Sequence, residues 1–380
     1  MNLSYSRGLV IVYPYGTFIR KREKTMIVKT KKVSSIIEKK LLLIEDKLGL
    51  GIIILSEPIK INLKQFRALY KYHLITEADR QKWWPKYTKL YAYDIINVKF
   101  FRHPILLEYG AGPQITVKPE NVEFLKIFIG MSGYYYRHMY PDKTKDILKY
   151  YSENLNSVEI NSTFYRLPTN STIKNLLKYD LAYTFKVSRY ITHTKRLKDI
   201  SKYWKNFYDA LKPLHNNIFC FLFQFSANFI FNEENFKRLS KLSSVLNRKG
   251  KGAHHYAFEF REIGWFNERI RKLFEKNNWI FVIVHVENND GWAGNLADGF
   301  NPPLNKYTPT SDTIYFRMHG TKGQYIGSYN NQYLNKIREF IAKYKPAYSA
   351  IYFNNTDANA DSLDNAITLY NKFNPYNLTL

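Results

Sequence analysis

The sequence contains little cysteine and no long apolar run. Its 380 residues include one cysteine, Cys220, so no intramolecular disulfide can form. Because Cys220 lies within an apolar segment, we expect a buried thiol and a reducing compartment. No stretch approaches about 20 consecutive apolar residues, and the first residues lack the layout of a secretory signal. We therefore expect a cytoplasmic protein without membrane contact.

Several catalytic and metal-binding motifs are also absent. The chain has no HExxH, no pair of CxxC motifs, no GxSxG and no P-loop. Zinc proteases, zinc fingers, esterases and P-loop nucleotide hydrolases therefore have no support. The first predicted strand is followed by GMSGYY, which differs from the Gly-rich turn of dinucleotide-binding sheets, so an open doubly wound sheet is not favoured.

Positive charge is in large excess, with a formal net charge of +25. Such an excess favours anionic partners, either a small anionic molecule or nucleic acid. A second explanation stays open, because an AT-rich genome favours Lys, Asn, Ile and Tyr whatever the function. The oligomeric state is not indicated by the sequence.

The residues from 121 to 380 alternate short β-branched and aromatic runs with segments of helical periodicity. Eight such repeats in about 250 residues predict an α/β fold, an eight-stranded parallel (β/α)8 TIM-type barrel. The strands are expected at 124–132, 157–161, 183–188, 218–225, 256–261, 279–286, 313–320 and 349–355. The helices are expected at 142–155, 170–179, 198–213, 232–247, 267–277, 331–345 and 359–373.

Residues 1–120 show a different pattern and predict a small α/β domain of unknown role. A linker is expected at 107–124, which contains two Pro and two Gly, and a helix-like segment at 63–96. Aromatic and basic residues that interleave here form either a surface for stacking single-stranded nucleic acid or the apolar face of a small domain. These residues are Trp83, Trp84, Tyr87, Tyr91 and Tyr93, with Lys82, Lys86 and Lys89.

Polar side chains lie at the carboxyl ends of the predicted barrel strands. Side chains two apart on a strand share a face, so Glu259 and Arg261 point one way and the phenylalanines beside them the other. The same alternation places Arg317 and His319 on one face of their strand. Active sites of β/α barrels form where the strands end, which predicts one shared pocket. The predicted pocket also includes polar residues at the ends of the other strands, namely Glu159, Asn161, Lys186, Gln224, His285, Glu287, Asn354 and Asn355.

The charges of this predicted pocket must neutralise one another or a ligand, because burial of one unpaired charge costs several kcal/mol. The alternative to a functional pocket is a ring of salt bridges that only closes the barrel, and such a ring needs only two or three charged partners. Polar residues at the ends of five or more strands therefore favour a functional pocket. Its cations suit an anion such as phosphate or carboxylate. A divalent metal ion is less favoured, because these cations lie beside the candidate ligands Glu159, Glu259, His285, Glu287 and His319.

Over residues 126–373 the chain resembles the YecE-like barrel family, also called domain of unknown function 72. The resemblance rests on IGMSGYYYRHMYP, YYSENLNSVEINSTFYRLP, TFKVSRYITHTKRL, FLFQF, AFEFREIGWF, TIYFRMHG, GSYNNQYL and YFNNTDANADSLDNA. It implies the barrel fold but no activity. It adds Gly133, Thr163, Tyr165, Thr192, His193, Trp265, Gly320 and Tyr329 to the site residues named above. Two positions depart from the family pattern, Tyr134 in place of Trp and His285 in place of a carboxylate.

The leading hypothesis is an enzyme, a hydrolase or lyase that acts on a phosphate-bearing substrate such as nucleic acid or a nucleotide. In it Glu159 or Glu259 is the general base and His319 the general acid. Lys186, Arg261 and Arg317 bind the anion, and walls for a base or sugar ring are expected from Tyr134, Tyr165 and Trp265. Two alternatives stay open, a non-catalytic nucleic-acid or ligand-binding protein and a sugar-phosphate isomerase.

Overall fold

The computed structural model describes residues 5–109, 116–246, 254–287, 300–356, 359 and 361–373. The chain divides into two compact units, Met1–Lys126 and Ile127–Phe373. No helix within the described ranges is long and apolar enough to span a bilayer.

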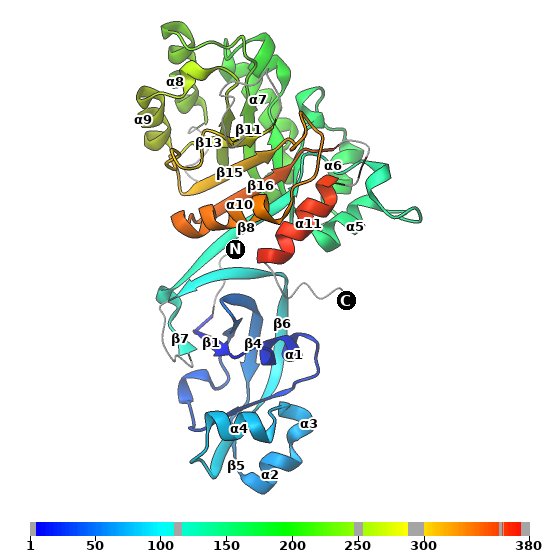
Figure 1. The fold of residues 1–380 in the computed structure, drawn as a ribbon, viewed down its shortest axis with the longest axis vertical. Coiled ribbons are helices and arrows are strands. Elements are labelled where there is room, and N and C mark those ends of the chain that lie inside the picture. The colour runs from blue at the N-terminus through cyan, green and yellow to red at the C-terminus, as the bar shows by residue number, and fades with distance from the viewer. Residues whose placement is uncertain are drawn as a thin grey trace. The chain divides into compact units, whose positions relative to one another are not determined.

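The N-terminal unit is built on a mixed sheet with strand order β7-β1-β3-β4-β6, to which β2 and β5 add through β6 (Figure 1). Its apolar core contains Leu9, Leu43, Leu50, Ile53 and Phe66, all nearly or completely buried. The elements are β1 (Arg7–Ile11), α1 (Tyr15–Arg20), β2 (Met26–Lys29), β3 (Leu41–Glu45), β4 (Leu48–Leu55), β5 (Ile59–Asn62), α2 (Leu63–Ala68), α3 (Tyr70–His73), α4 (Glu77–Trp83), β6 (Lys89–Tyr109) and β7 (Thr116–Val117).

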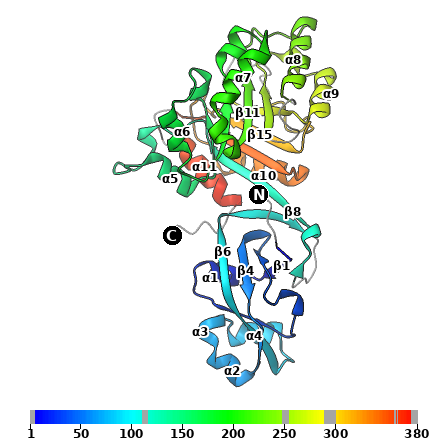
Figure 2. The ribbon, with the colours of Figure 1, turned by 180° about the vertical axis from the view of Figure 1, so that it is seen from behind.

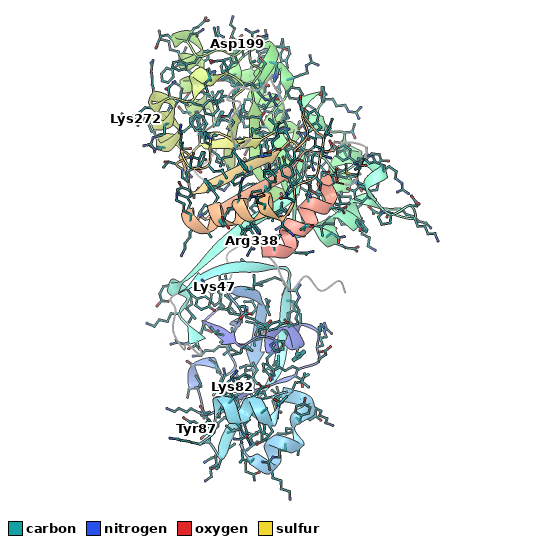
Figure 3. All side chains as sticks on the ribbon, in the orientation of Figure 1. Lys47, Lys82, Tyr87, Asp199, Lys272 and Arg338 are labelled. Atoms are coloured by element: carbon teal, nitrogen blue, oxygen red, sulfur yellow. The ribbon has the colours of Figure 1, made fainter. Side chains whose placement is uncertain are left out.

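The segment 63–96, predicted as helix-like, forms three short helices followed by the start of β6. Most of its aromatic residues pack inward rather than forming an exposed stacking surface. Tyr93 is completely buried, and the Trp83 ring lies 5.6 Å from the Tyr15 ring in an edge contact. Tyr87, which Figure 3 labels, is 40% exposed. The aromatic cluster therefore belongs largely to the core of a small domain.

The region 107–124, predicted as a linker, is partly β structure. The end of β6 pairs antiparallel with the start of β8 (Val122–Met131), from Leu106 opposite Leu125 to Tyr109 opposite Val122. Strand β7 pairs with β1. Residues 110–115 of the predicted linker lie outside the described part of the chain. The linker prediction is thus wrong for residues 107–109, 116–117 and 122–124, which pair as strands.

The C-terminal unit is an eight-stranded parallel, nearly closed barrel, which confirms the predicted fold class. Its order is β8-β16-β15-β13-β12-β11-β10-β9, and a parallel bridge between Ser132 and Glu159 joins its first and last strands. The short β14 pairs antiparallel with β13. After β8 the strands are β9 (Ser157–Ile160), β10 (Ala182–Lys186), β11 (Ile218–Gln224), β12 (His255–Glu259), β13 (Ile280–His285), β14 (Phe300–Asn301), β15 (Thr313–Met318) and β16 (Tyr348–Phe353).

Helices surround these strands, as Figures 1 and 2 show. Several begin at side chains that cap the free backbone N–H groups, as Asp146, Asn267 and Asn330 do. The helices are α5 (Ile147–Asn154), α6 (Asn170–Leu176), α7 (Ile200–Ala210), α8 (Glu233–Leu246), α9 (Glu268–Asn277), α10 (Asn331–Tyr344) and α11 (Asp361–Phe373). Each overlaps a helix predicted from the sequence.

Two apolar layers follow from the alternation of side chains along the strands. Inside the barrel, Leu222, Ala257 and Val284 pack together, and the thiol of Cys220 is buried as predicted. Between strands and helices lies a larger layer rich in aromatic residues, where Phe258 packs on Phe274 of α9 at 5.0 Å between ring centroids. Polar residues that share the inward face of these strands therefore point into the barrel, near the carboxyl ends of the strands.

Candidate functional site

A chain of four charges of alternating sign occupies the carboxyl end of the barrel. Arg317 of β15 donates to Glu159 of β9 through Nη2 at 2.7 Å and Nε at 3.1 Å, and to Glu259 of β12 through Nη1 at 2.5 Å. The Nε of Arg261 donates to the other Glu259 oxygen at 2.8 Å. We call Glu159, Lys186, Glu259, Arg261, Arg317 and His319 the polar cluster.

Glu159 is held by more donors than Arg317 alone. Its Oε1 accepts from the hydroxyl of Ser132 at 2.7 Å, and its Oε2 from the hydroxyl of Tyr315 at 2.5 Å. Each carboxylate oxygen therefore has two donors, and the side chain is completely buried. These four hydrogen bonds compensate the cost of burying the charge. The Glu159 carboxylate is therefore better suited to hold Arg317 in place than to accept a proton.

The environment of the cluster also fixes the protonation of Glu259 and His319. Burial raises the pKa of Glu259, but Arg317 and Arg261 outweigh burial and hold the pKa below its usual range. Burial, with Arg317 second, holds the pKa of His319 well below its ordinary value. The Nδ1 of His319 lies 2.9 Å from Nδ2 of Asn354. At neutral pH Glu259 is therefore ionised and His319 is neutral.

Lys186, the last residue of β10, is the cation of the cluster without an ionic partner. Within the described ranges its Nζ makes no hydrogen bond or ion pair, and it lies 4.2 Å from the centroid of the Phe164 ring. Burial and, next, Arg317 lower the pKa of Lys186 to about 8, although Glu259 and Glu159 act in the opposite direction. The ammonium group of Lys186 thus adds a third positive charge to the two negative charges of Glu159 and Glu259.

The loops after β9 and β10 surround Lys186. The register of the two strands ends with Phe185 opposite Ile160. Asn161 follows β9 directly, and its Oδ1 is buried without a hydrogen-bond partner in the described structure. The ring of His193 lies 5.0 Å from that of Phe164, edge to face. Burial, followed by Lys186 and Arg189, lowers the pKa of His193 to about 4.

Three further predicted site residues lie near these groups. Tyr165 is 72% exposed, with its ring 5.1 Å from that of Phe164. Gln224 lies opposite Glu259 in the register of β11 and β12, and its Nε2 donates to the carbonyl of Phe225 at 2.6 Å. Asn354 contacts His319, as described above. The structure therefore brings these three to the same end of the barrel as the polar cluster.

Trp265 does not form the wall that the sequence predicts. Its indole is completely buried and stacks on Phe229 at 4.9 Å and on Phe260 at 4.7 Å between ring centroids. Its Nε1 donates to the carbonyl of Phe229. The interpretation is corrected because the indole is buried within the aromatic layer outside the barrel.

Tyr329 and His285 also lie outside the polar cluster, which corrects their expected place in the pocket. On β13 the even-numbered residues Val282 and Val284 face the barrel interior, so His285 points outward. Its Nδ1 lies 2.8 Å from the hydroxyl of Tyr329, and that oxygen accepts from the N–H of Gly320 at 2.8 Å. Glu287 lies on this outer side as well, where it accepts from the hydroxyl of Tyr333.

Replacing Tyr329 with phenylalanine should lower the free energy of unfolding by about 1–3 kcal/mol, because buried polar groups of His285 and Gly320 lose a partner. Urea denaturation of the parent and the variant measures this loss. Ligand binding at the polar cluster should stay unchanged, since the hydroxyl does not face it. A Tyr329→Phe variant with parental stability and lost anion binding would contradict this placement.

Tyr134 and Asn355 likewise differ from their expected roles. Tyr134 lines a separate hollow of about 480 Å³ with Arg137 and Asn175, among others. Asn355 is buried and donates from Nδ2 to the carbonyl of Gly327 at 2.9 Å and to Asn365 at 3.0 Å. It therefore fixes the segment before α10 rather than facing the cluster.

Sequence reasoning missed Ser132, Tyr315 and Phe164. Tyr315 lies two residues before Arg317 on the same strand face, so the alternation that selected Arg317 could have selected it too. Ser132 follows the end of the first strand and bridges Glu159. Nothing in the sequence marks Phe164, because its contact with Lys186 comes from the 3-10 turn at Ser162–Phe164.

The described residues do not gather a set of metal ligands. No group of three or more His, Cys, Asp or Glu side chains in the described part of the chain could hold a metal ion. Glu159 and Glu259 face arginine and hydroxyl donors instead, and His285 points away from them. The predicted ligands therefore do not fit a divalent metal ion in this arrangement.

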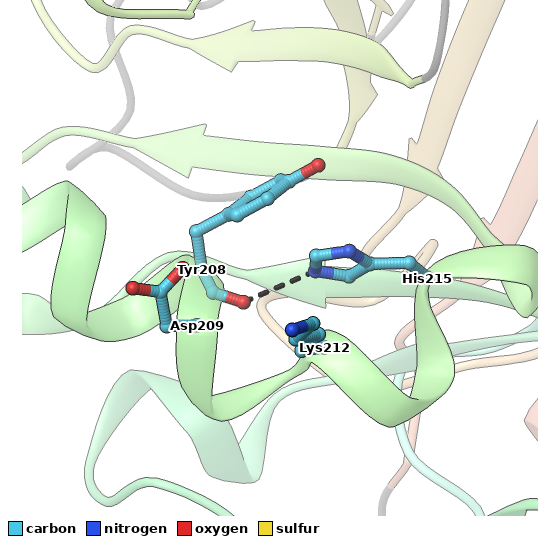
Figure 4. A pocket seen from close by; sticks show the side chains of 4 residues that line it. All are labelled: Tyr208, Asp209, Lys212 and His215. Carbon is cyan, nitrogen blue, oxygen red and sulfur yellow. Dashed lines mark hydrogen bonds between the residues drawn. The ribbon is translucent and has the colours of Figure 1, made fainter. Parts of the chain in front are cut away.

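A further hollow lies at the opposite end of the barrel strands from the polar cluster. It measures about 590 Å³ and is lined by Tyr208, Asp209, Lys212 and His215, which come from the end of α7 and the turn before β11 (Figure 4). The Nε2 of His215 lies 3.1 Å from the carbonyl of Tyr208. The candidate site is thus defined by its buried charges and not by this hollow.

Comparison with known proteins agrees with the fold. A family model described as "Protein of unknown function DUF72" matches residues 128–379. A crystal structure of a DUF72 family protein from Thermotoga maritima is 24% identical, covers 66% of this chain and 99% of its own, and gives a TM-score of 0.56. One from Enterococcus faecalis is 20% identical, covers 67% and 96%, and gives 0.54. A search of curated proteins finds no match.

Proposed function

This chain belongs to the DUF72 family, whose description states no activity, and we propose that its barrel is an enzyme acting on a phosphate-bearing substrate. The reaction class is a hydrolase or lyase, with a nucleotide or nucleic acid as the substrate. The observation that carries the proposal is the excess positive charge at the carboxyl ends of the strands, where Lys186 has no ionic partner.

The excess charge follows from the pairing within the polar cluster. Both oxygens of Glu259 are engaged by arginines, and both oxygens of Glu159 have two donors. Burying an ammonium group without a counterion is unfavourable, so an anionic ligand would stabilise the arrangement. Arg261, whose side chain is 18% exposed, is the arginine placed to share such an anion with Lys186.

The geometry favours different roles from those that the sequence predicts. A carboxylate with a lowered pKa is a weak base, and a histidine that is neutral at pH 7 is a poor source of protons. Glu159 and Glu259 instead position the two arginines, which supply the positive field for a developing negative charge. Lys186, with a pKa of about 8, is the reacting group, because groups that titrate near the working pH transfer protons most effectively.

Two groups in the segment after β9 support a substrate with a ring and hydroxyl groups. The exposed ring of Tyr165 offers a face for stacking a base or sugar. The unpartnered Oδ1 of Asn161 needs a donor, which a sugar hydroxyl would supply. A nucleotide or nucleic acid offers the anion, the ring and the donor together.

The two other hypotheses have less support. A binding module that uses the N-terminal aromatic cluster requires exposed rings, yet most of these rings pack into the core of that unit. A metal-dependent sugar-phosphate isomerase requires a ligand set that the described residues do not assemble.

Orthophosphate at about 100 times its dissociation constant should raise the free energy of unfolding by about 2.7 kcal/mol. The physical reason is that the folded protein binds the anion and the unfolded chain does not. Thermal denaturation with potassium phosphate, against potassium chloride of equal ionic strength, measures the effect. Lys186→Met should lose most of this gain.

The matched control is Lys272→Met, which removes an exposed lysine from α9 and keeps the net charge change the same (Figure 3). It should respond to phosphate like the parent. If the two variants respond alike, or the parent does not respond, the proposal fails.

A panel of nucleotides and oligonucleotides should also be turned over at least about 100-fold more slowly by Lys186→Met, the range that loss of acid–base catalysis gives.

A further inference from the structure

The amine of Lys186 is placed as a nucleophile rather than as a structural cation. A buried lysine normally pairs with a carboxylate, but the nearby carboxylates already bind arginines. Its Nζ faces the ring of Phe164 at 4.2 Å, and no acceptor in the described structure fixes its orientation. The amine is therefore free to turn toward a bound substrate.

The surroundings also favour the uncharged amine. Burial and Arg317 both disfavour a further positive charge at this position, and the pKa of Lys186 is lowered to about 8. A lysine next to another cation or in an apolar setting is the usual form of an activated amine nucleophile. A useful fraction of Lys186 is thus neutral near physiological pH.

Two neighbours can assist addition of the amine to a carbonyl group. Asn161 presents the buried Oδ1 that has no partner in the described structure, which can accept a hydrogen bond from a new hydroxyl group. The imidazole of His193 contacts the same Phe164 ring as Lys186 does, and it is the group at this site that would relay a proton. Arg261 supplies positive charge for an anionic group of the same molecule.

We propose that Lys186 forms a Schiff base with an open-chain sugar phosphate, in which a carbonyl group and a phosphate belong to one substrate. The proposal rests on the phosphate-binding function above, selects a lyase reaction for that site, and takes an open-chain sugar phosphate in place of a nucleotide as the phosphate-bearing substrate. It requires no metal ion, oxidant or reductant.

The covalent step balances as an addition and a dehydration. The nitrogen lone pair forms a bond to the carbonyl carbon, and one proton of the amine passes to the carbonyl oxygen, which becomes a hydroxyl group. That hydroxyl then leaves as water with a second proton, which yields a protonated imine. The protonated imine accepts the electron pair of the bond between the α and β carbons, which breaks to leave an enamine, while the hydroxyl group on the β carbon loses its proton and becomes the carbonyl group of the first product. Protonation of the enamine carbon restores the imine, and addition of water to it releases the second product and the amine of Lys186.

Reductive trapping tests the inference on the full-length parent protein. The protein is incubated with dihydroxyacetone phosphate and sodium cyanoborohydride, and adducts are assigned to individual lysines by peptide mass spectrometry. We expect Lys186 to be labelled at least about 10-fold faster than the exposed lysines, because its lowered pKa leaves more of its amine neutral at the pH of the incubation. The preference should disappear when the parent is unfolded in urea before trapping.

Two matched comparisons make the result decisive. Uncharged dihydroxyacetone lacks the phosphate and should label Lys186 at least about 10-fold more slowly, the factor that a difference of about 1.4 kcal/mol in binding gives. Lys186→Arg keeps the charge but has no amine able to form an imine, so the adduct at this position should vanish while the other lysines react as before.

The outcomes separate this inference from the function on which it rests. Labelling spread over exposed lysines, with no preference for Lys186, overturns the inference, even where orthophosphate still stabilises the protein. Equal labelling of Lys186 by both probes supports the nucleophile and counts against phosphate binding. Preferential labelling by the phosphorylated probe supports both.

Discussion

Replacing Arg317 with methionine should lower the free energy of unfolding at pH 7 by about 3–5 kcal/mol or more, the range found when one partner of a buried ion pair is removed. The guanidinium group binds two buried carboxylates, on Glu159 and Glu259, at once. Methionine fills much of the same volume but offers neither charge nor donors. Both carboxylates would then remain buried with fewer compensating donors.

Arg271→Met is the matched control, because Arg271 also binds two carboxylates, those of Glu268 and Glu275, but on the exposed face of α9. Exposed ion pairs contribute up to about 1 kcal/mol, so this variant should remain close to the parent. Urea denaturation followed by circular dichroism measures both variants. Equal losses for Arg317→Met and Arg271→Met would show that the polar cluster has no special structural role.

The loss in the free energy of unfolding that Arg317→Met causes should also depend on pH. In the parent, Arg317 and Arg261 hold the pKa of Glu259 below its unfolded value, so the unfolded state binds more protons as the pH falls. The stability that this pair contributes is present above the unfolded pKa of about 4.3 and is lost as pH falls below it. The two unfolding curves should therefore approach each other between about pH 5 and pH 3.

The fold could be predicted because the barrel repeats one physical pattern. Strands such as 256–261 alternate Phe258, which faces the helices, with Ala257 and Glu259, which face inward. The same alternation, read along each strand by itself, is enough to predict that Glu259 and Arg317 face inward. Their pairing also depends on the register between distant strands, which single-strand periodicity does not supply.

Side-chain direction could not be predicted where the sequence shows no alternation of polar and apolar residues. Strand β13 is apolar on both faces, so its sequence does not tell whether His285 or its neighbours point inward. Trp265 and Tyr329 lie beyond regular strands, in turns whose direction depends on tertiary packing. The same holds for the Phe164 turn, which places an aromatic ring against Lys186.

Lys186→Met should raise the free energy of unfolding at pH 7, in contrast to most substitutions at buried positions. The parent must bury an ammonium group whose pKa falls from 10.5 to about 8. One pKa unit corresponds to about 1.4 kcal/mol, so removing the ammonium group should raise the free energy of unfolding by roughly 3 kcal/mol at most. Because the side chain is partly exposed, we expect a gain of about 1–3 kcal/mol. A group kept for function at a cost in stability would behave in this way.

The pH dependence of this gain identifies its cause. Below pH 8 the amine is charged in both folded and unfolded parent, so the full penalty is present and the variant should be most favoured. Between pH 8 and 10.5 the unfolded state binds more protons than the folded state, so the stability of the parent rises with pH and the gain should shrink. Lys186→Arg retains the charge and should show no such gain. If Lys186→Met is destabilised at pH 7, or its gain is constant up to pH 10, the ammonium group has a partner and is not the uncompensated charge on which the proposed site depends.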